Sequence, residues 1–212
     1  MSQMFTQNVI LSSRSAVMHV PGFLDWQTAD SLTERISDQI TFARPTISMF
    51  GKPSLLPREV AWIADNDLRY AYSGISTRPV HWPRFLHPIR QLVEAQAGTS
   101  FNSVLVNRYE DGNDTVGWHS DDEPELGPAP IIASLSLGAT RRFLLRNKHT
   151  KETFRFDLAH GDLLLMLGEC QMEFTHSVPR TRKVVAPRVN LTFRNLIAPH
   201  HVRVQTVNSK QQ

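Results

Sequence analysis

The sequence predicts an α+β fold in which two helices near the N-terminus pack on one side of a β-jelly roll. Apolar residues recur at helical spacing in two stretches before Gly98, and the chain then changes to short β-rich runs separated by turn residues or polar loops. No internal repeat or low-complexity linker divides it. With 212 residues, of which 41% are hydrophobic, the chain can bury one core, so we expect a single domain.

The two helices are predicted from their apolar spacing. The first should lie within residues 25–42, where Asp25 can cap the N-terminus and the apolar positions are Ala29, Leu32, Ile36 and Ile40. The second should run from about Pro83 to Gly98, because glycine can end a helix there. Its apolar positions are Leu86, Ile89, Leu92, Val93 and Ala97. The strands expected after it are FNSVLVNRY, IIASLSLGA, RRFLLRN, TFRFDL, DLLLML, MEFTHSV and RVNLTFRNLI.

The charge distribution favours a polyanionic partner. The formal net charge is +3, but residues 110–125 hold seven acids and no Lys or Arg, which leaves +10 on the rest of the chain. A basic body around one acidic spot suits nucleic acid, although basic surfaces also serve solubility. Two basic clusters could contact phosphates: Arg141, Arg142, Arg146, Lys148 and Lys151, and then Arg180, Arg182 and Lys183.

The cysteine count and the hydropathy pattern bear on location. The single cysteine, Cys170, excludes an internal disulfide and a multi-cysteine zinc site, and suits a reducing compartment. The chain has no signal-peptide pattern at its start and no apolar run near the length of about 18 residues that a membrane helix needs. We expect a cytoplasmic monomer with no membrane partner, associated with the nucleoid in a bacterium or nuclear in a eukaryote.

A possible metal site begins in the stretch GWHSDDEPELGP, residues 117–128. His119 and Asp121 are two residues apart, so in an extended segment their side chains project to the same side. His176 lies in a predicted strand that the fold could bring back to them. Two histidines and one carboxylate suit a non-haem Fe(II) oxygenase. The alternatives are zinc with an activated water, a solvated acidic loop, and a hydrogen-bonded core histidine at position 176.

The strand PRVNLTFRN alternates with period two. One face carries Arg188, Asn190, Thr192 and Arg194, and the other carries Val189, Leu191 and Phe193. On an edge strand the polar face would meet water. In a barrel interior the two guanidinium groups would need anionic partners, because an unpaired buried charge is costly, and a small dicarboxylate would satisfy both.

Four features together resemble the AlkB family of Fe(II)- and 2-oxoglutarate-dependent nucleic-acid dealkylases, particularly the branch of the human homologue two. They are NRYEDGNDTVGWHSDDE, IASLSLGATRRF, the isolated His176 and APRVNLTFR, and the similarity covers about residues 45–197. The resemblance implies a double-stranded β-helix and iron held by His119, Asp121 and His176. It also implies that Arg188 and Arg194 hold the two carboxylate ends of 2-oxoglutarate, with further hydrogen bonds from Asn107, Tyr109 and Asn190.

The function implied by this resemblance is oxidative demethylation of 1-methyladenine and 3-methylcytosine in DNA, with O2 as the second co-substrate and with release of formaldehyde and succinate. Tyr70 and Tyr72 would line the pocket for the flipped base, and Phe50 would fill the gap that this base leaves. Asp122 and Glu123 would favour a cationic, methylated base. Two alternatives stay open: an oxygenase acting on RNA or a small molecule, and a catalytically silent module that binds alkylated bases.

The resemblance also suggests a division of the chain. Residues 1–44 would form an N-terminal extension with the first helix, and residues 45–98 a nucleotide-recognition segment with the second. Residues 99–197 would form the catalytic double-stranded β-helix, joined to the preceding parts in one domain over residues 1–197, and residues 198–212 would be a polar tail.

Overall fold

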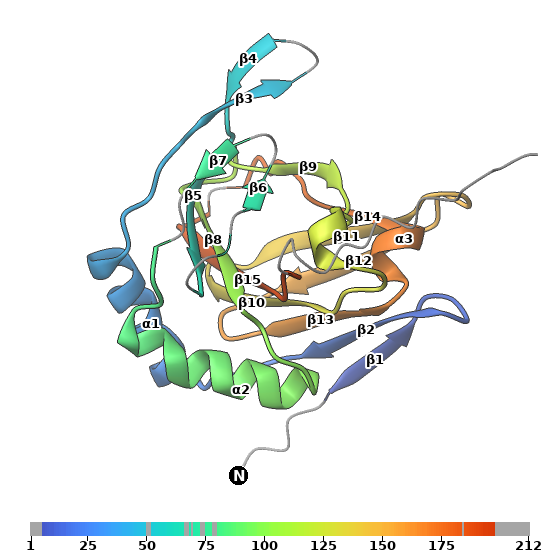
Figure 1. Cartoon of the computed structure of the whole chain (residues 1–212), viewed down its shortest axis with the longest axis horizontal. Helices are drawn as coiled ribbons and strands as arrows, with labels where there is room; N and C mark the ends of the chain where they lie inside the picture. The colour runs from blue at the N-terminus through green and yellow to red at the C-terminus, as the bar shows by residue number, and fades with distance from the viewer. Residues whose placement is uncertain are drawn as a thin grey trace, which may run out of the picture.

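Two antiparallel β-sheets face each other, and two helices cover the outer side of the larger sheet (Figure 1). This arrangement comes from a computed structural model that describes residues 6–49, 52–65, 68, 70–72, 75–77, 80–183 and 185–197, with the backbone alone at residues 47–49, 52, 70–72 and 75–77. The order of the layers is therefore helices, larger sheet and smaller sheet, with the larger sheet in the middle.

The larger sheet has the strand order β1-β2-β13-β10-β15-β8-β5. These strands are β1 (Gln7–Ile10), β2 (Ser15–Val20), β13 (Leu163–Gly168), β10 (Ile132–Gly138), β15 (Arg188–Arg194), β8 (Ser103–Tyr109) and β5 (Glu59–Ala64). The smaller sheet has the order β12-β11-β14-β9. Its strands are β12 (Thr153–Leu158), β11 (Arg141–Asn147), β14 (Phe174–Val178) and β9 (Val116–His119).

Two short hairpins and the helices complete the described fold. The hairpins pair β3 (Thr46–Met49) with β4 (Lys52–Leu55), and β6 (Tyr70–Tyr72) with β7 (Ile75–Thr77). The helices are α1 (Trp26–Gln39), η1 (Arg84–Leu86), α2 (His87–Ala97), η2 (Pro124–Leu126) and α3 (Cys170–Glu173). The β3–β4 hairpin projects beyond the two sheets (Figure 1).

Both predicted helices are confirmed, with caps that explain their limits. The Asp25 side chain accepts a hydrogen bond from the backbone N–H of Thr28 at 2.8 Å and so satisfies one of the free donors at the start of α1. At the end of α2, Gly98 has φ 67°, a left-handed conformation that glycine adopts without steric cost. The second prediction missed one detail, because Leu92 is 50% exposed.

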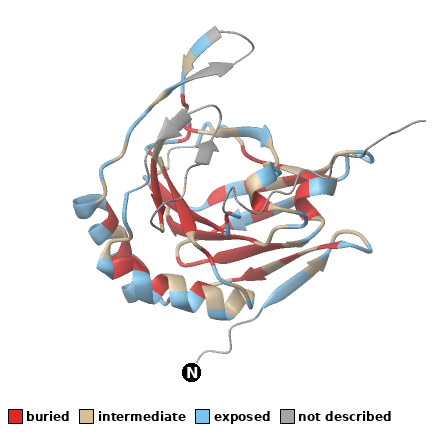
Figure 2. Cartoon of the chain, viewed as in Figure 1, coloured by how far each residue is buried: buried red, intermediate tan, exposed pale blue. Residues whose placement is uncertain are grey.

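Alternation along the strands buries apolar side chains on both faces of the larger sheet (Figure 2). On β15, Val189, Leu191 and Phe193 face the helices and join a cluster with Ala29, Leu32 and Ile36 of α1 and with Ile89 and Val93 of α2. The space between the sheets holds a second apolar cluster, which includes Phe143, Phe156 and Phe174. Burial of side chains on both faces of the larger sheet explains why its central strands are rich in apolar residues.

The seven strands expected after Gly98 are confirmed, whereas β9 after Gly98 and β1, β2 and β5 before it were missed. β2 pairs with β13, and β5 pairs with β8, so both belong to the larger sheet. A short apolar run such as AVMHV or VAWIA does not distinguish a strand from part of a helix by its periodicity. The segments 1–44 and 45–98 therefore contribute strands to the same sheet as residues 99–197.

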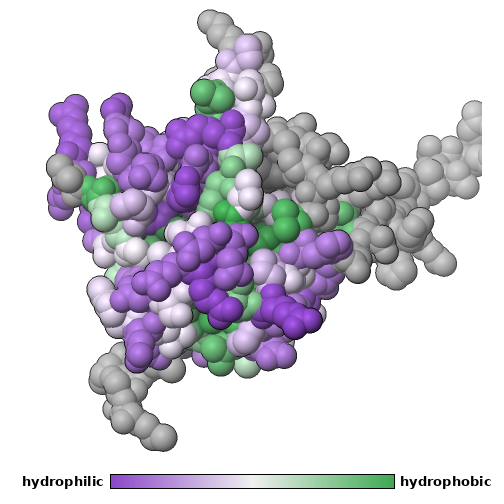
Figure 3. All heavy atoms as spheres, turned by 90° about the vertical axis from the view of Figure 1, so that its left-hand side faces the viewer, coloured by the Kyte–Doolittle hydropathy of each residue, from purple (hydrophilic) through white to green (hydrophobic). Residues whose placement is uncertain are grey.

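The helix-bearing side of the molecule is mostly hydrophilic, with a narrower hydrophobic area (Figure 3). α1 explains much of this polarity, because its buried residues are Ala29, Leu32 and Ile36 and most of its other positions are exposed. None of the described helices is long and apolar enough to cross a membrane.

Candidate active site

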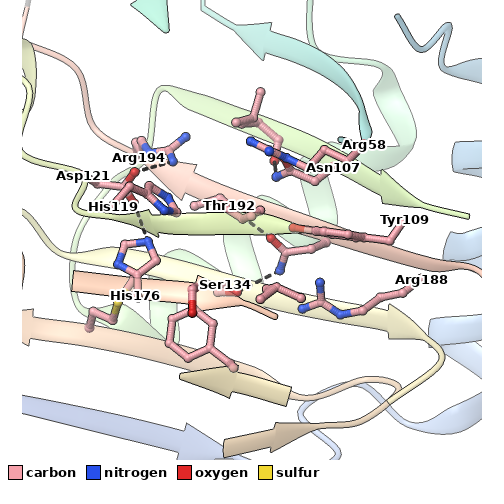
Figure 4. Close-up of a pocket in the computed structure, with 17 residues that line it drawn as sticks. Arg58, Asn107, Tyr109, His119, Asp121, Ser134, His176, Arg188, Thr192 and Arg194 are labelled. Atoms are coloured by element: carbon pink, nitrogen blue, oxygen red, sulfur yellow. Dashed lines mark hydrogen bonds and ion pairs between the residues drawn. The ribbon is translucent and has the colours of Figure 1, made fainter. Parts of the chain in front are cut away.

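A cavity opens between the two sheets. Part of it is open to solvent. Its lining comes from β8, β9, β10, β11, β13, β14 and β15, together with Arg58 just before β5 and Asp121 just after β9. Figure 4 shows His119, Asp121 and His176 gathered at one end, and Arg188 beside Tyr109 at the other.

The first end of the cavity is a cluster of three potential metal ligands. His119, Asp121 and His176 each offer one ligand atom, and these atoms lie within 4.8 Å of one another. The two histidines are direct partners across the β14–β9 pair, with ring centroids 4.2 Å apart. The fold therefore brings His176 beside His119, on the neighbouring strand.

Hydrogen bonds orient His119 and Asp121. His119 can donate from Nδ1 to the Gly117 carbonyl at 2.9 Å, which leaves Nε2 with the lone pair that a metal needs. Asp121 donates from its backbone N–H to the Gln171 side chain at 3.0 Å, and its Oδ1 accepts from Arg194 at 2.7 Å. The second carboxylate oxygen, Oδ2, is buried with no hydrogen-bond partner among the described residues.

The electrostatics keep Asp121 and His176 in the protonation states that metal binding needs. Burial raises the pKa of Asp121, but the charge of Arg194 and the nearby histidines outweigh it and lower this pKa to about 2. Burial lowers the pKa of His176 to about 3, so its imidazole is neutral near pH 7. A buried carboxylate that has one oxygen without a hydrogen-bond partner among the described residues, next to two imidazoles, fits Fe(II) by its donor chemistry and by its geometry.

The second end of the cavity is a buried cation. Arg188 is 2% exposed, its Nη2 donates to Ser136 Oγ at 2.9 Å, and its guanidinium lies 5.1 Å from the centroid of the Tyr109 ring. Its Nε and Nη1 have no hydrogen-bond partner among the described residues. Because an unpaired buried charge costs several kcal/mol, this end of the cavity is suited to an anion.

The polar face of β15 connects the two ends, as its alternation predicted. All four of its polar residues line the cavity. Asn190 donates to Ser134 Oγ at 2.8 Å and accepts from Thr192 at 2.8 Å, and Asn107 on β8 accepts from Arg58 at 2.7 Å.

Comparisons with known proteins agree with this geometry. The profile of the 2OG-Fe(II) oxygenase superfamily matches residues 16–194. The DNA oxidative demethylase ALKBH2 of Mus musculus is 40% identical over 180 residues, which cover 80% of this chain and 75% of that protein. The chain belongs to the AlkB family. It is an Fe(II)- and 2-oxoglutarate-dependent dioxygenase, and the confirmed cofactors are Fe(II) and 2-oxoglutarate.

Other AlkB relatives extend the comparison. The alpha-ketoglutarate-dependent dioxygenase alkB homolog 3 of Bos taurus is 40% identical over 192 residues, which cover 86% of this chain and 66% of that protein. The solved structure of OsALKBH1 matches 89% of this chain and 100% of its own, with a TM-score of 0.63 and 17% identity. At that identity the likeness concerns the fold, and it confirms the double-stranded β-helix.

The residues expected to recognise substrate are placed less completely. Asp122 is exposed and lies 3.4 Å from Lys148, and neither Asp122 nor Glu123 belongs to the described lining of the cavity. The backbone of Tyr70 and Tyr72 lies in β6, but their side chains are outside the description, and Phe50 is outside the described residues. Their roles stay predictions.

Sequence reasoning missed several polar residues of this AlkB site. Ser134 and Ser136 alternate within the apolar strand IASLSLG, a signal that could have placed them on the same face as Asn190. Arg58 lines the cavity just before β5, and Gln171, 1% exposed on α3, holds the backbone of Asp121. Nothing in their local sequence distinguishes these two, because their partners come from other parts of the chain.

Proposed function

We propose that this AlkB-family dioxygenase removes methyl groups from alkylated bases in nucleic acid, and that its substrate is DNA carrying 1-methyladenine or 3-methylcytosine. The relatives named DNA oxidative demethylase support the choice of DNA. The basic body of the chain supports a nucleic-acid partner in general, since it would attract phosphates.

The residue roles form part of this proposal. The proposed iron ligands are His119, Asp121 and His176, with Arg194 and Gln171 holding Asp121 in position. Arg188 and Arg194 would bind the two carboxylate ends of 2-oxoglutarate, and the further hydrogen-bonding partners would be Asn107, Tyr109 and Asn190. Iron would supply the oxidant from O2 and 2-oxoglutarate: 2-oxoglutarate would lose CO2 and become succinate, with one oxygen atom of O2 going to succinate and the other to the N-methyl group. The resulting hydroxymethyl group would leave as formaldehyde.

The observation that carries the proposal is the pairing of two incomplete sites in one cavity. Among the described residues, Asp121 has a buried oxygen without a hydrogen-bond partner at one end, and Arg188 has two nitrogen atoms, Nε and Nη1, without one at the other. A metal would complete the first and a carboxylate the second. A silent binding module needs neither, so this pairing favours an active enzyme.

A two-stage experiment tests the proposal. In the first stage, Fe(II) and 2-oxoglutarate are added to the protein without oxygen, and a metal-to-ligand charge-transfer band is expected. In the second, oxygen is admitted with methylated oligonucleotides as single-stranded DNA, double-stranded DNA and RNA, and formaldehyde and succinate are measured. Matched unmethylated oligonucleotides are the control.

The outcomes separate the alternatives. Formaldehyde from methylated DNA supports the proposal, and formaldehyde from RNA alone would replace DNA by RNA as the substrate. Oligonucleotide binding without formaldehyde, after a normal charge-transfer band, would contradict demethylation. The predicted roles of Phe50, Tyr70, Tyr72, Asp122 and Glu123, the monomeric state and the cellular location are parts of the proposal that separate measurements must test.

A further inference from the structure

Arg141 is a buried cation that does not line the active-site cavity. It begins β11 and is 3% exposed, so it is unavailable to phosphates, where the sequence analysis had placed it in a basic cluster. Its guanidinium donates three hydrogen bonds to backbone carbonyls: those of Asp111 at 2.9 Å, Asp114 at 2.9 Å and Pro179 at 3.0 Å.

These three carbonyls belong to the loops that end the functional strands. Asp111 and Asp114 lie between Tyr109, the last residue of β8, and Val116, the first residue of β9. Pro179 follows directly after β14. One guanidinium therefore joins the loops next to the strands that carry Tyr109, His119 and His176.

Arg141 also contacts the aromatic ring at the anion-accepting end of the cavity. Its guanidinium carbon lies 5.6 Å from the centroid of the Tyr109 ring, and that of Arg188 lies 5.1 Å from the same centroid. Tyr109 is 2% exposed, so its ring position depends on these contacts and on the apolar cluster between the sheets. A guanidinium within about 6 Å of a ring centroid stabilises that ring position.

The two guanidinium groups repel each other inside the protein. Burial lowers the pKa of Arg188, and the charge of Arg141 lowers it further, while Tyr109 opposes both effects. A carboxylate arriving at Arg188 would be attracted by both charges, because the interior screens charge weakly. The second charge thus favours a ligand with a carboxylate at this end.

We propose that Arg141 is a positioning residue for the co-substrate: it fixes Tyr109 beside Arg188 and supplies a second positive charge behind the pocket for the distal carboxylate of 2-oxoglutarate. This inference rests on the assignment of 2-oxoglutarate to Arg188 in the proposed function. Arg141 acts through Tyr109 and through its charge, without touching the ligand.

The test measures 2-oxoglutarate binding to the Mn(II)-loaded protein by calorimetry, in wild type and in Arg141→Lys. Lysine keeps the charge but cannot make three directed hydrogen bonds and stack as a planar group. The dissociation constant for 2-oxoglutarate should rise about three- to thirtyfold, because the cation–π contact of Arg141 with Tyr109 and the hydrogen bonds of Arg141 are weakened, and the usual strength of such contacts corresponds to this factor. Affinity for Mn(II) should stay within about twofold of wild type, because Arg141 bonds to none of the three proposed ligands.

Two controls make the result specific. Arg155→Lys changes an exposed arginine on β12 of the same sheet and should bind 2-oxoglutarate as wild type does. Arg188→Lys tests the assignment on which the inference rests. If Arg188→Lys binds 2-oxoglutarate normally, the proposed co-substrate site fails. If Arg188→Lys is impaired and Arg141→Lys is not, only the inference about Arg141 fails.

A double-mutant cycle separates positioning from general loss of structure. In a Tyr109→Leu background, Arg141→Lys should raise the dissociation constant for 2-oxoglutarate by a smaller factor than in wild type, because the ring through which it acts is gone. Equal factors in both backgrounds, or a matching loss of Mn(II) affinity, would overturn the positioning role. If Arg141→Lys does not fold, Arg141→Gln, which keeps amide donors without charge, replaces it in the same cycle.

Discussion

Replacing Arg188 with methionine should make the ligand-free protein more stable while it abolishes binding of 2-oxoglutarate. Arg188 is fully buried, and two of its N–H groups have no partner among the described residues. Methionine has a similar length and can fill the same space without a charge. Burial of this cation destabilises the ligand-free protein, although the cation is needed to bind the ligand. The substitution thus removes this desolvation cost.

The size of the effect follows from the contacts that Arg188 makes. Replacing a buried charge by a packed apolar residue often raises the free energy of unfolding by about 1–4 kcal/mol, and we expect a gain of this order from removing the guanidinium of Arg188. The loss of its hydrogen bond with Ser136 and of its contact with Tyr109 costs about 1–2 kcal/mol. We expect a net gain of about 1–2 kcal/mol, which for a chain of this size raises Tm by about 2–8 °C.

Thermal unfolding with and without 2-oxoglutarate, in the presence of Mn(II), measures both effects. Wild-type Tm should rise when the ligand is added, because a ligand at about 100 times its dissociation constant adds about 2.7 kcal/mol. Tm of Arg188→Met should start higher and not respond to the ligand. Arg155→Met, at an exposed position on β12, is the control and should leave both values unchanged. A ligand-free Arg188→Met protein that melts below wild type would refute the argument that this cation is held at a cost.

Four further predictions concern the site and the fold. Alanine at any proposed iron ligand should abolish formaldehyde release while the circular dichroism spectrum stays unchanged; the variants are His119→Ala, Asp121→Ala and His176→Ala. Turnover by any of them at the iron concentration used for wild type would reject the ligand set. Arg194→Lys should raise the 2-oxoglutarate concentration for half-maximal rate by about tenfold, since an ammonium cannot make a two-pronged contact, and steady-state kinetics would show it. Asp162→Asn should lower the free energy of unfolding at pH 7 by about 1–3 kcal/mol, measured in urea. Burial raises the pKa of Asp162, but hydrogen bonds from His19 and two backbone N–H groups hold it below its usual value, so this deficit should shrink as pH falls below about 4. Glu123→Gln should reduce single-turnover repair of cationic 1-methyladenine more than repair of neutral ethenoadenine, and Asp122→Asn should show a smaller difference between the two lesions. No difference between the two variants would contradict a larger role for Glu123 in reading charge.

Local pattern was enough to predict the parts of the fold that repeat with a fixed period. The alternation in RVNLTFR correctly separated a cavity face from a core face, because every second residue of a strand points the same way. The Asp25 cap and the Gly98 stop were readable for the same reason, since each acts on its own helix end. These features depend on neighbours in the chain.

Features that depend on distant partners could not be read in this way. The pairing of His176 with His119 is set by the β14–β9 register, and nothing within either stretch specifies it. Gln171 and Arg141 hold functional loops through hydrogen bonds to backbone groups. Because backbone groups are alike along the chain, the sequence does not show which of them these side chains contact. The family resemblance predicted that His176 and His119 lie together. The contacts of Gln171 and Arg141 depend on the tertiary structure, and the resemblance did not predict them.

The acidic stretch DDEPE shows how the fold gives neighbouring carboxylates different environments. Asp121 is 1% exposed, and Arg194 and two histidines surround it, so it can serve a metal. Asp122 points to solvent beside Lys148, where water and that cation weaken its field on a bound base. Glu123 has one buried carboxylate oxygen with no hydrogen-bond partner among the described residues. Because a carboxylate acts on a cationic base most strongly where water is excluded, charge selection should depend more on Glu123 than on Asp122.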